Sequence, residues 1–504
     1  MNKPTKQTKK AIQPLREEDF PEWFQQVVTA ADLAENSPVR GAMIIKPWGY
    51  AIWELIQREL DRRIQETGHQ NVYFPLFIPL HFFEKEAAHV EGFAKECAVV
   101  THHRLEEKEG RLVPGGPLAE PLVVRPTSET IIGEAFSRWV ESYRDLPLLI
   151  NQWANVVRWE MRPRMFLRTT EFLWQEGHTA HATPEEALEE SLKMVEVYRS
   201  LMEDYLSIPV IFGEKSPGER FPGAENTFTL EAMMQDGKAL QSCTSHYLGQ
   251  NFSKASSIRF TNKKGELEYA YTTSWGLTTR VIGSLIMCHG DDDGLRLPPL
   301  IAPHQVVLIP IVPSPEVEAE ILHFTETLAL ELKKISFGGK PVRVHVDKRD
   351  RRGGEKNWEW IKKGVPIRLE IGPKELASHS VMLSRRDRPP HEKESFSASA
   401  LVQQIGDFLQ QIQTHYYTEA AAYRAQKWRT DILDLEGLHR FFAETDKKAH
   451  GFVAAKWCGD PETEKLLQDG VTIRCIPTAQ SGTVGRCILT GKEATLDALF
   501  AKSY

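Results

Sequence analysis

The spacing of apolar residues along the chain changes at a cluster of prolines, Pro298, Pro299 and Pro303. Short apolar runs that predict buried strands follow at 306–311, 342–346 and 367–371. Amphipathic segments that predict helices lie between them at 316–335 and 356–363. This alternation predicts a small α/β domain with a mostly parallel sheet. A long helix is then expected over 398–428.

Before the prolines, segments of helical period alternate with strand-like runs from residue 41 onward. Residues 1–40 predict a polar lead-in with one short amphipathic helix over 20–33. The proline cluster is the clearest boundary. The expected domains are therefore the lead-in at 1–40, a large domain at 41–300, an α/β domain at 301–410 and a C-terminal domain at 411–504. The fold class is expected to be α/β and α+β, in several domains.

Composition is that of an ordinary globular protein, with 41% hydrophobic and 26% charged residues. The net charge is −7, so a nucleic-acid surface would have to be a local basic patch. The six scattered cysteines form no disulfide framework, and residues 1–15 lack the apolar core of a secretory signal. No apolar run approaches about 20 residues. We therefore expect a cytoplasmic protein without a membrane partner.

The most informative stretch is 152–179, where strand-like runs at 152–161 and 166–179 flank a basic turn. Alternate side chains of a strand share a face. The shared faces carry Arg158 and Glu160 on the first run, and Arg168, Thr170, Phe172, Trp174, Glu176 and His178 on the second. Unpaired buried charge costs several kcal/mol, so this is not a core-packing face. A solvated outer face and a platform for a nucleotide and an amino acid are the alternatives.

The hairpin resembles motif 2 of the class II aminoacyl-tRNA synthetases, through residues 156–160 (VVRWE) and 168–172 (RTTEF). The resemblance implies that Arg158 binds the α-phosphate of ATP and that Arg168 reaches the γ-phosphate. It places Glu160 and Phe172 at the adenine, with Thr169 also at the nucleotide. A class II catalytic domain built on an antiparallel sheet is implied with it.

Two further segments resemble the other class II motifs. Residues 274–280 (SWGLTTR), followed by an apolar helix, are similar to motif 3, which makes Arg280 a second γ-phosphate contact. Residues 41–75 resemble motif 1, a long helix and a strand at a dimer interface. Taken alone, that segment predicts only an amphipathic core helix. The resemblance implies a homodimer in which Arg158, Arg168 and Arg280 are the catalytic residues.

Three stretches resemble the prolyl-tRNA synthetases in particular. In residues 125–130 (RPTSET), Thr127 and Glu129 would bind the imino group of proline, although the same residues are typical of a helix start. In residues 173–179 (LWQEGHT), Trp174, Glu176 and His178 would line the ring pocket, with Arg158 beside them. In residues 240–252, the resemblance assigns Gln241 and Thr244 to ATP and His246 to proline. Cys243 stands where the family more often has Gly, and Phe221 would close the pocket.

The segment between residues 179 and 274 is too short for a large inserted domain. It spans about 95 residues, and a domain usually needs about 100–150. The sequence therefore resembles the archaeal/eukaryotic-like form without an inserted editing domain. The basic segment 347–356 and the run 361–368 resemble the anticodon-binding domain of this form. Arg352, Glu355, Lys356 and Arg368 are the anticodon candidates, while a charged surface loop is the alternative.

The tail resembles the C-terminal domain of the same form, which usually carries a four-cysteine zinc site. Cys458 and Cys487 stand at ligand positions, but Thr463 and Thr490 occupy the partner positions. Cys475 lies in the segment 473–477, which supplies no ligand in that pattern. Zinc needs four ligands, so no structural zinc is expected.

The function implied is the joining of L-proline to tRNA(Pro) through a prolyl-adenylate made from ATP and magnesium. Gln241 is the magnesium candidate and Glu231 the acidic alternative. Such phosphoryl chemistry needs positioning and charge neutralisation, so no general base is assigned. The alternatives are a class II synthetase for threonine, glycine, serine or histidine, a non-catalytic RNA-binding relative, and an amino-acid ligase without tRNA.

Overall fold

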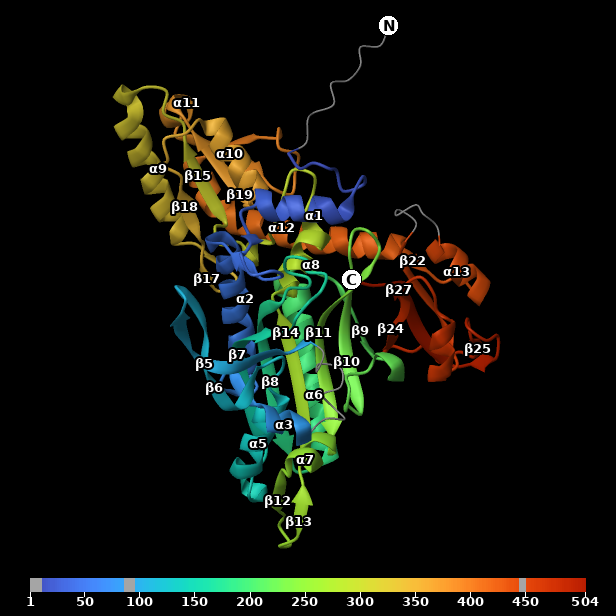
Figure 1. The fold of residues 1–504 in the computed structure, drawn as a ribbon. Helices are drawn as coiled ribbons and strands as arrows, with labels where there is room; N and C mark the ends of the chain where they lie inside the picture. Colours follow the sequence, from blue (N-terminus) through green and yellow to red (C-terminus); the bar gives the residue numbers. More distant parts are fainter. Residues whose placement is uncertain (1–10, 86–95, 444–449) are drawn as a thin grey trace.

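The computed structural model describes residues 11–85, 96–443 and 450–504, so residues 1–10 of the expected lead-in lie outside it. Its main body is an 11-stranded sheet, shown with its covering helices in Figure 1. Neighbouring strands are antiparallel except at the two edges, where β3 with β7 and β22 with β23 are parallel. In sheet order the strands are β22 (Trp428–Arg429), β23 (Phe452–Trp457), β27 (Leu496–Lys502), β24 (Val471–Pro477), β9 (Val210–Glu214), β10 (Asn226–Met233), β11 (Ala239–Gly249), β14 (Tyr271–Thr278), β8 (Glu171–His181), β7 (Leu148–Val157) and β3 (Gln70–Asn71).

Helices of the large domain cover this sheet. The long helix α6 (Pro184–Ser200) crosses one face, where Tyr198 donates to Gln175 of β8 and Ser191 accepts from Ser245 of β11. The helix starts at Thr183, whose hydroxyl caps it by accepting from the Glu186 N–H. The remaining helices are α1 (Phe20–Ala30), α2 (Pro47–Glu66), α3 (Leu80–Lys85), α5 (Glu129–Trp139), α7 (Asn251–Ser256) and α8 (Arg280–His289).

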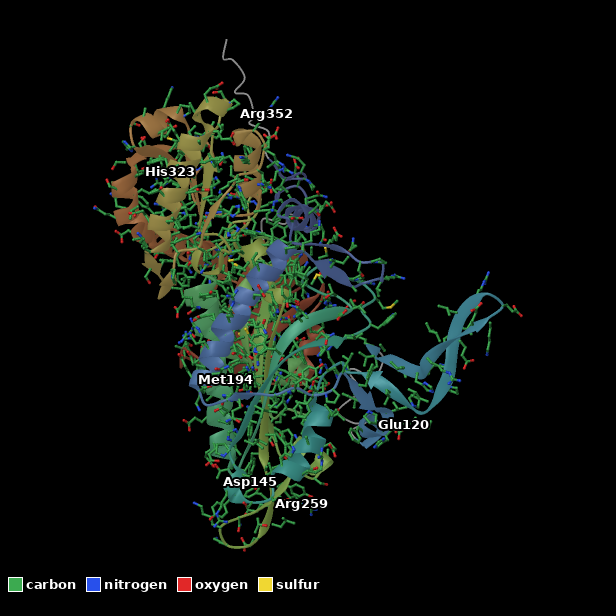
Figure 2. The ribbon with its side chains drawn as sticks, turned by 90° about the vertical axis from the view of Figure 1, so that its left-hand side faces the viewer. Glu120, Asp145, Met194, Arg259, His323 and Arg352 are labelled. Carbon is green, nitrogen blue, oxygen red and sulfur yellow. The ribbon has the colours of Figure 1, made fainter. Side chains whose placement is uncertain are left out.

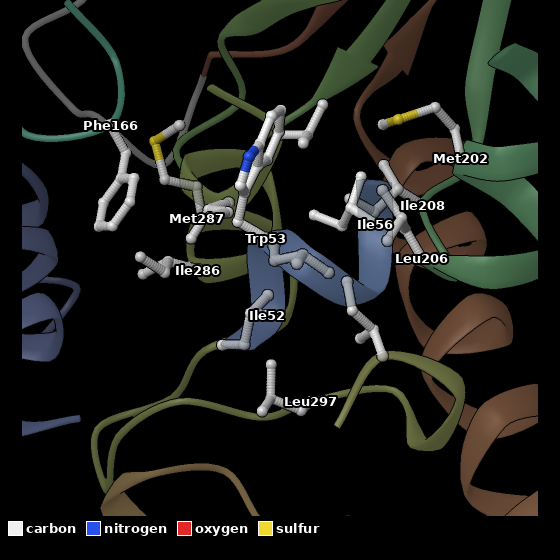
Figure 3. Close-up of a cluster of buried hydrophobic side chains, with 14 of the residues drawn as sticks. Ile52, Trp53, Ile56, Phe166, Met202, Leu206, Ile208, Ile286, Met287 and Leu297 are labelled. Atoms are coloured by element: carbon white, nitrogen blue, oxygen red, sulfur yellow. The ribbon is translucent and has the colours of Figure 1, made fainter. Parts of the chain in front are cut away.

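One large apolar core joins α1, α2, α6 and α8 to the sheet. Figure 3 shows part of it, with Ile52 and Trp53 of α2 among Met202, Leu206 and Ile286. Trp23 of α1 is fully buried in this core. Residues 11–40 therefore pack as part of the large domain, because the amphipathic face predicted over 20–33 has a hydrophobic surface to cover.

Smaller strand pairs surround the large domain. A three-stranded sheet contains the long hairpin that reaches away from the body in Figure 2, near the labelled Glu120. The described strands of the large domain that lie outside the main sheet are β1 (Ala34–Asn36), β2 (Met43–Ile45), β4 (Phe77–Pro79), β5 (Ala98–Lys108), β6 (Arg111–Val124), β12 (Arg259–Thr261) and β13 (Leu267–Tyr269). The motif 1 segment forms α2, β2 and β3, as its resemblance implied.

The predicted α/β domain is present after the prolines. Strand β15 (Val306–Pro310) lies between β18 (Val344–Val346) and β19 (Ile367–Ile371) and is parallel to both, which confirms the parallel core of the prediction. Strands β20 (Ser380–Arg385) and β21 (Glu394–Ser397) extend the sheet in antiparallel order. The other elements are α9 (Glu318–Lys333), β16 (Ser336–Phe337), β17 (Lys340–Pro341), α10 (Gly353–Lys362), α11 (Pro373–Ala377) and α12 (Ala398–Gln426).

Helix α12 runs through residue 410, where the sequence placed a boundary, and carries the chain on to the C-terminal domain. That domain contains α13 (Leu435–Ala443), the small pair β25 (Gly485–Arg486) and β26 (Glu493–Ala494), and strands β22, β23, β24 and β27. Residues Ile476 and Pro477 of β24 pair with Glu214 and Gly213 of β9. The C-terminal domain thus continues the sheet of the large domain by main-chain hydrogen bonds.

Candidate active site

A cavity of about 510 Å³ lies on the side of the sheet away from α6. Gln175 points to α6, where it binds Tyr198, so its neighbours Trp174 and Glu176 point the other way, into the cavity. The residues that the sequence assigned to ATP and proline all line it: Thr127, Glu129, Arg158, Glu160, Arg168, Thr169, Phe172, Trp174, Glu176, His178, Phe221, Gln241, Thr244, His246 and Arg280. The platform interpretation of the hairpin is therefore supported over the solvated outer face.

Arg158 and Glu160 reach the cavity from a loop. The prediction of a strand through residue 161 is wrong, because β7 ends at Val157 and β8 begins at Glu171. The Arg158 N–H still donates to Thr170 O at 2.8 Å, so the two segments stay paired for one residue beyond the strands. Gly41 contacts the same segment: its φ is +83°, a backbone conformation that favours glycine, and its carbonyl accepts from the Thr170 N–H.

The Arg158 guanidinium lies between a carbonyl and two aromatic rings. Its Nε donates to Pro126 O at 2.9 Å, and its central carbon lies 5.6 Å from the Phe172 ring centre and 5.7 Å from that of Trp174. Burial lowers the pKa of Arg158, while Glu129 and other carboxylates oppose the shift. The side chain stays a cation that is fixed in place, suited to a phosphate.

Arg280 begins α8 and lines the same cavity. Its Nε donates to Leu167 O at 3.1 Å, and its N–H donates to the Thr278 hydroxyl at 3.1 Å. Burial, followed by repulsion from Arg168 and Arg158, lowers the pKa of Arg280 to about 10. Three arginines that repel each other in one cavity are stabilised by an anion between them.

Farther along the strands from Arg280, the cavity holds the buried carboxylate of Glu176 and two histidines, His178 and His246, which both pair with Ser274 in the ladder. Glu176 accepts from Ser128 at 2.6 Å and from Gln152 at 2.7 Å, and its second oxygen lies 3.0 Å from Nε2 of His178. Burial alone would lower the pKa of His178, but the hydrogen bond to Glu176 raises it above its ordinary value. The pair can therefore carry opposite charges inside the protein.

His246 has the opposite electrostatic character. Burial, with repulsion from His178, lowers its pKa to about 3, so the ring is neutral. Its Nδ1 lies 3.1 Å from the Thr227 hydroxyl. The Phe221 ring stacks on it, with centroids 4.5 Å apart and an interplanar angle of 28°. Together they form an aromatic wall of the cavity, in the same row of the sheet as His178.

Thr127 and Glu129 enter the cavity where α5 begins. The Thr127 hydroxyl donates to the Glu129 carboxylate. Ser128 is the N-cap residue, yet its side chain makes no capping bond and donates to Glu176 instead. The helix-start interpretation explains the position of this segment but not its side-chain contacts, which face the cavity.

Comparisons with known proteins agree along the whole chain. A family described as "tRNA synthetase class II core domain (G, H, P, S and T)" matches residues 116–289, "Anticodon binding domain" matches 305–407, and "Prolyl-tRNA synthetase, C-terminal" matches 440–504. A "Proline--tRNA ligase" of Protochlamydia amoebophila is 71% identical over 501 residues, which cover 98% of this chain and 99% of that protein. The chain belongs to the proline–tRNA ligases.

Other relatives of this proline–tRNA ligase are similar over their full length. A "Proline--tRNA ligase" of Paramagnetospirillum magneticum is 58% identical, covering 99% of this chain and 100% of that protein. The crystal structure of prolyl-tRNA synthetase from Cryptosporidium parvum complexed with L-proline and AMP superimposes with a TM-score of 0.88 at 37% identity, covering 98% of this chain and 97% of that one. A second crystal structure of that enzyme, complexed with halofuginone and AMPPNP, has the same TM-score at 39% identity, covering 98% and 99%.

Several cavity residues of this ligase were missed by sequence reasoning. Ser242, Ser274 and Thr278 line the cavity. Within the described ranges, the buried hydroxyls of Ser242 and Ser274 and the Trp174 Nε1 have no hydrogen-bond partner in the protein. Such buried polar groups are normally satisfied, so they are open to a ligand. Strand alternation would have pointed to all three, because Ser242 lies two residues from Thr244, and Ser274 and Thr278 lie two residues on either side of Gly276.

Glu231, the acidic alternative for magnesium, is fully buried and already paired. Its Oε1 accepts from Lys215 Nζ at 2.7 Å, and its Oε2 accepts from Arg474 Nη2 at 3.1 Å. Gln241 lies opposite Glu231 in the β10–β11 ladder and lines the cavity with a half-buried amide. Of the two, Gln241 is the one that lines the cavity.

The anticodon candidates divide into two pairs. Arg352 and Glu355 are exposed at the start of α10, whereas Lys356 and Arg368 are buried. The Lys356 Nζ donates to Asp347 O at 3.0 Å, and the Arg368 Nε donates to Asn357 Oδ1 at 2.8 Å. The structure therefore places only the first pair where a base could be touched directly.

Two residues at the positions of the family's zinc ligands, Thr463 and Cys487, are held by hydrogen bonds and apolar packing. The Thr463 hydroxyl accepts from Trp457 Nε1 at 2.9 Å and donates to Asp460 O at 2.6 Å. Cys487 is buried in an apolar core. In the part of the chain that the structure describes, no three His, Cys, Asp or Glu residues are grouped as a metal site. None of the described helices is long and apolar enough to cross a membrane.

Proposed function

We propose that the residues of this cavity divide between them the two steps of proline–tRNA ligation. As a proline–tRNA ligase, the chain activates L-proline with ATP to prolyl-adenylate and pyrophosphate, and then transfers proline to the 3′ end of tRNA(Pro). The observation that carries the assignment is one cavity lined by three arginines and by a buried carboxylate–histidine pair, with Arg280 after the end of β14 and His178 farther back along the same strands, level with Ser274.

The arginine end is proposed to bind ATP. Arg158 would neutralise the α-phosphate, where the proline carboxylate attacks, and Arg168 and Arg280 would hold the γ-phosphate. Phe172, which Arg158 approaches, would stack on the adenine, with Glu160, Thr169 and Thr244 also at the nucleotide. Attack in line requires placement and charge neutralisation, which fixed cations supply without a protein nucleophile.

Magnesium is proposed to bind at the same end. The donor offered is the Gln241 amide oxygen, and magnesium prefers oxygen ligands and shares them with substrate phosphates and water. When bound, the ion would neutralise charge on the phosphates. Gln241 would orient it, because β11 fixes the amide beside Thr244.

The carboxylate end is proposed to bind proline. The Glu129 carboxylate and the Thr127 hydroxyl would accept the two N–H groups of the secondary ammonium. Trp174, Phe221 and the neutral His246 would enclose the ring, and the Glu176–His178 pair would close the polar side. The size of the pocket would exclude larger rings, while discrimination by one methylene is worth only about 1–3 kcal/mol.

The α/β domain is proposed to bind the tRNA anticodon. Arg352 and Glu355 would contact bases, and Lys356 and Arg368 would hold the segment from beneath through Asp347 and Asn357. Trp358 is 40% exposed on the same helix and offers a surface for stacking.

We also propose a homodimer in the cytoplasm. Large apolar side chains are exposed on and beside the motif 1 segment, with exposures of 44% at Tyr50, 73% at Tyr73 and 45% at Phe77. The projecting β5–β6 hairpin belongs to the same three-stranded sheet as Phe77 (Figure 2). Exposed apolar area of this kind is typical of a protein interface. Light scattering on the purified chain gives the mass: twice 57.4 kDa supports the dimer, and 57.4 kDa contradicts it.

The test of the function is charging of tRNA with labelled proline. We expect charging that requires ATP and magnesium, and a product that releases proline at mild alkaline pH, as an ester does. No charging of any tRNA by folded protein would favour the non-catalytic relative. Charging with another amino acid would move the assignment within class II.

A further inference from the structure

Arg474 extends from the C-terminal domain into the large domain, to the edge of the proposed ATP site. Its side chain is 6% exposed. Nε, Nη1 and Nη2 all donate: Nε and Nη2 bind Glu231 Oε2 at 3.2 and 3.1 Å, and Nη1 binds Thr472 at 2.9 Å. The Arg474 carbonyl accepts from Lys215 Nζ at 2.9 Å. Lys215, Glu231 and Arg474 form a buried ion trio with one surplus positive charge.

Two β-bulges bring this trio together. The register of β24 with β27 shifts between Ile473 and Cys475, which leaves Arg474 as the extra residue. The register of β10 with β11 shifts between Leu230 and Glu231. A bulge re-aims a side chain and is frequent beside active sites. Both irregularities lie where the charged side chains meet.

The trio lies directly against cavity residues. Glu231 pairs across the ladder with Gln241, and Thr229, which donates to Glu231 at 2.9 Å, pairs with Thr244. Arg474 Nη1 also lies 4.0 Å from Glu219 Oε2, a carboxylate of the cavity wall. Arg474 is thus held by two carboxylates, one of them on the cavity wall, and, besides burial, its repulsion is among the causes that lower the pKa of Arg280 in the cavity.

We propose that Arg474 is a positioning residue for ATP: it holds the Glu231 carboxylate away from the cavity and adds its charge to the field that binds the triphosphate. The inference rests on the proposed ATP end of the site. It gives the C-terminal domain a part in the activation step. This part does not depend on the four-cysteine zinc site of the family, of which this chain has two cysteines. Proline is a zwitterion without net charge, so its binding should depend little on this field.

The test measures binding of the ATP analogue AMPPNP with magnesium by calorimetry, and the KM values for ATP and proline in pyrophosphate exchange. Arg474→Gln should weaken AMPPNP binding and raise the KM for ATP about tenfold, as one charge at intermediate dielectric predicts. The KM for proline should stay within about twofold of wild type on the same grounds. Arg474→Lys should restore most of the loss, because it keeps the charge.

Arg424→Gln is the matched control. Arg424 also approaches β9 from outside the large domain, donating to Val210 O at 3.0 Å, but it has no contact with Glu231 among those of the described residues. A variant at Arg474 that keeps wild-type AMPPNP affinity while losing thermal stability or active fraction overturns the proposal. So does a lysine variant as weak as the glutamine variant.

A second variant covers the case in which Arg474→Gln does not fold, and a second measurement separates this proposal from the proposed function. If Arg474→Gln does not fold, Thr472→Val releases one Arg474 hydrogen bond without stranding a charge, and a weaker AMPPNP affinity than wild type is expected. Unchanged affinity in that variant contradicts the proposal. If wild-type protein binds AMPPNP but exchanges no pyrophosphate with proline, the proposed function fails separately, and the AMPPNP affinities of the variants still decide the role of Arg474.

Discussion

Nε2 of His178 lies 3.0 Å from Oε2 of Glu176, two residues earlier on the same strand, and both side chains are almost fully buried. Side chains two apart on a strand share a face, so β8 itself sets this distance. A buried pair of this kind needs further hydrogen bonds to be tolerated, and Ser128 and Gln152 supply them to Glu176. These contacts hold the Glu176 carboxylate in one position on the cavity wall.

The pair predicts a pH dependence of stability. The pKa of His178 is raised in the folded protein, against an unfolded value of about 6.5. Its contribution to stability is therefore fully present below about pH 6.5 and is lost as pH rises through the folded-state pKa. Thermal unfolding from pH 5.5 to 9 should show a decline in wild type that His178→Asn removes. An identical decline in both proteins would assign the effect to other groups.

Replacement of Glu129 by Gln should weaken proline binding and leave ATP binding unchanged. The substitution removes the charge that would pair with the secondary ammonium of proline. A charged hydrogen bond is worth about 1.5–3 kcal/mol, so the KM for proline should rise roughly 10- to 100-fold in pyrophosphate exchange.

The matched control for Glu129 is Glu134→Gln, on the same helix but half-exposed and paired with Arg138. It should keep both KM values. An equal rise in the KM for ATP and proline in Glu129→Gln would show a general distortion of the site instead.

Arg352→Ala should reduce tRNA charging without affecting proline-dependent pyrophosphate exchange, because Arg352 lies in the α/β domain and not in the cavity. Loss of one contact to a base corresponds to about 1–3 kcal/mol, or roughly 5- to 150-fold in kcat/KM for tRNA. Lys374→Ala removes an exposed charge of the same domain and serves as the control. Equal loss in both variants would indicate only a nonspecific charge effect.

Lys356→Ala should act differently, through stability. Its ammonium group is buried and donates to Asp347 O, so its removal leaves that carbonyl without this partner. The expected cost is about 1–3 kcal/mol, measured by urea unfolding. Full stability together with lost tRNA charging would instead favour direct contact between Lys356 and tRNA.

The sequence predicted which residues line the cavity well wherever they lay in one segment. Residues 168–178 alternate as a strand should from Glu171 onward, so Trp174, Glu176 and His178 were placed on one face correctly. The end of β7 at Val157 was not predictable, because Arg158 and Glu160 continue the apolar–polar alternation while their backbone leaves the sheet. Alternation reports faces, and it does not report where hydrogen bonding to the next strand stops.

Contacts between distant segments account for what the sequence could not show. The burial of Lys356 depends on Asp347 and that of Arg368 on Asn357, whereas composition marked both only as basic residues near tryptophans. The pairing of β24 with β9 joins residues more than two hundred positions apart, and only a bulge turns Arg474 toward Glu231. Periodicity within one strand carries no information about either relationship.

The C-terminal domain should be stable without a metal because it has an apolar core of its own. Phe442 is 1% exposed and packs in the cluster that contains Trp457, Cys487 and Phe500. Phe442→Ala should cost about 3–5 kcal/mol in the unfolding of this domain. Leu433→Ala, at a side chain 73% exposed, should cost far less.

A chelator provides the complementary test. Thermal unfolding should be the same with and without a strong zinc chelator. Thr463 and Thr490 stand where the four-cysteine zinc site of this domain family has two of its thiolates. A lower unfolding temperature after chelation would show that this domain binds a metal through ligands other than the four cysteines of the family site.

The most direct test of the whole account is amino-acid-dependent exchange of pyrophosphate into ATP, measured with each of the twenty amino acids in the absence of tRNA. We predict strong exchange with proline alone, reduced at least about 100-fold by Arg158→Ala, as loss of a charge-stabilising group at the reacting centre predicts. Arg138→Ala, an exposed arginine outside the cavity, should leave it intact. Exchange with a different amino acid, or proline exchange that survives Arg158→Ala, would contradict the assignment of this cavity.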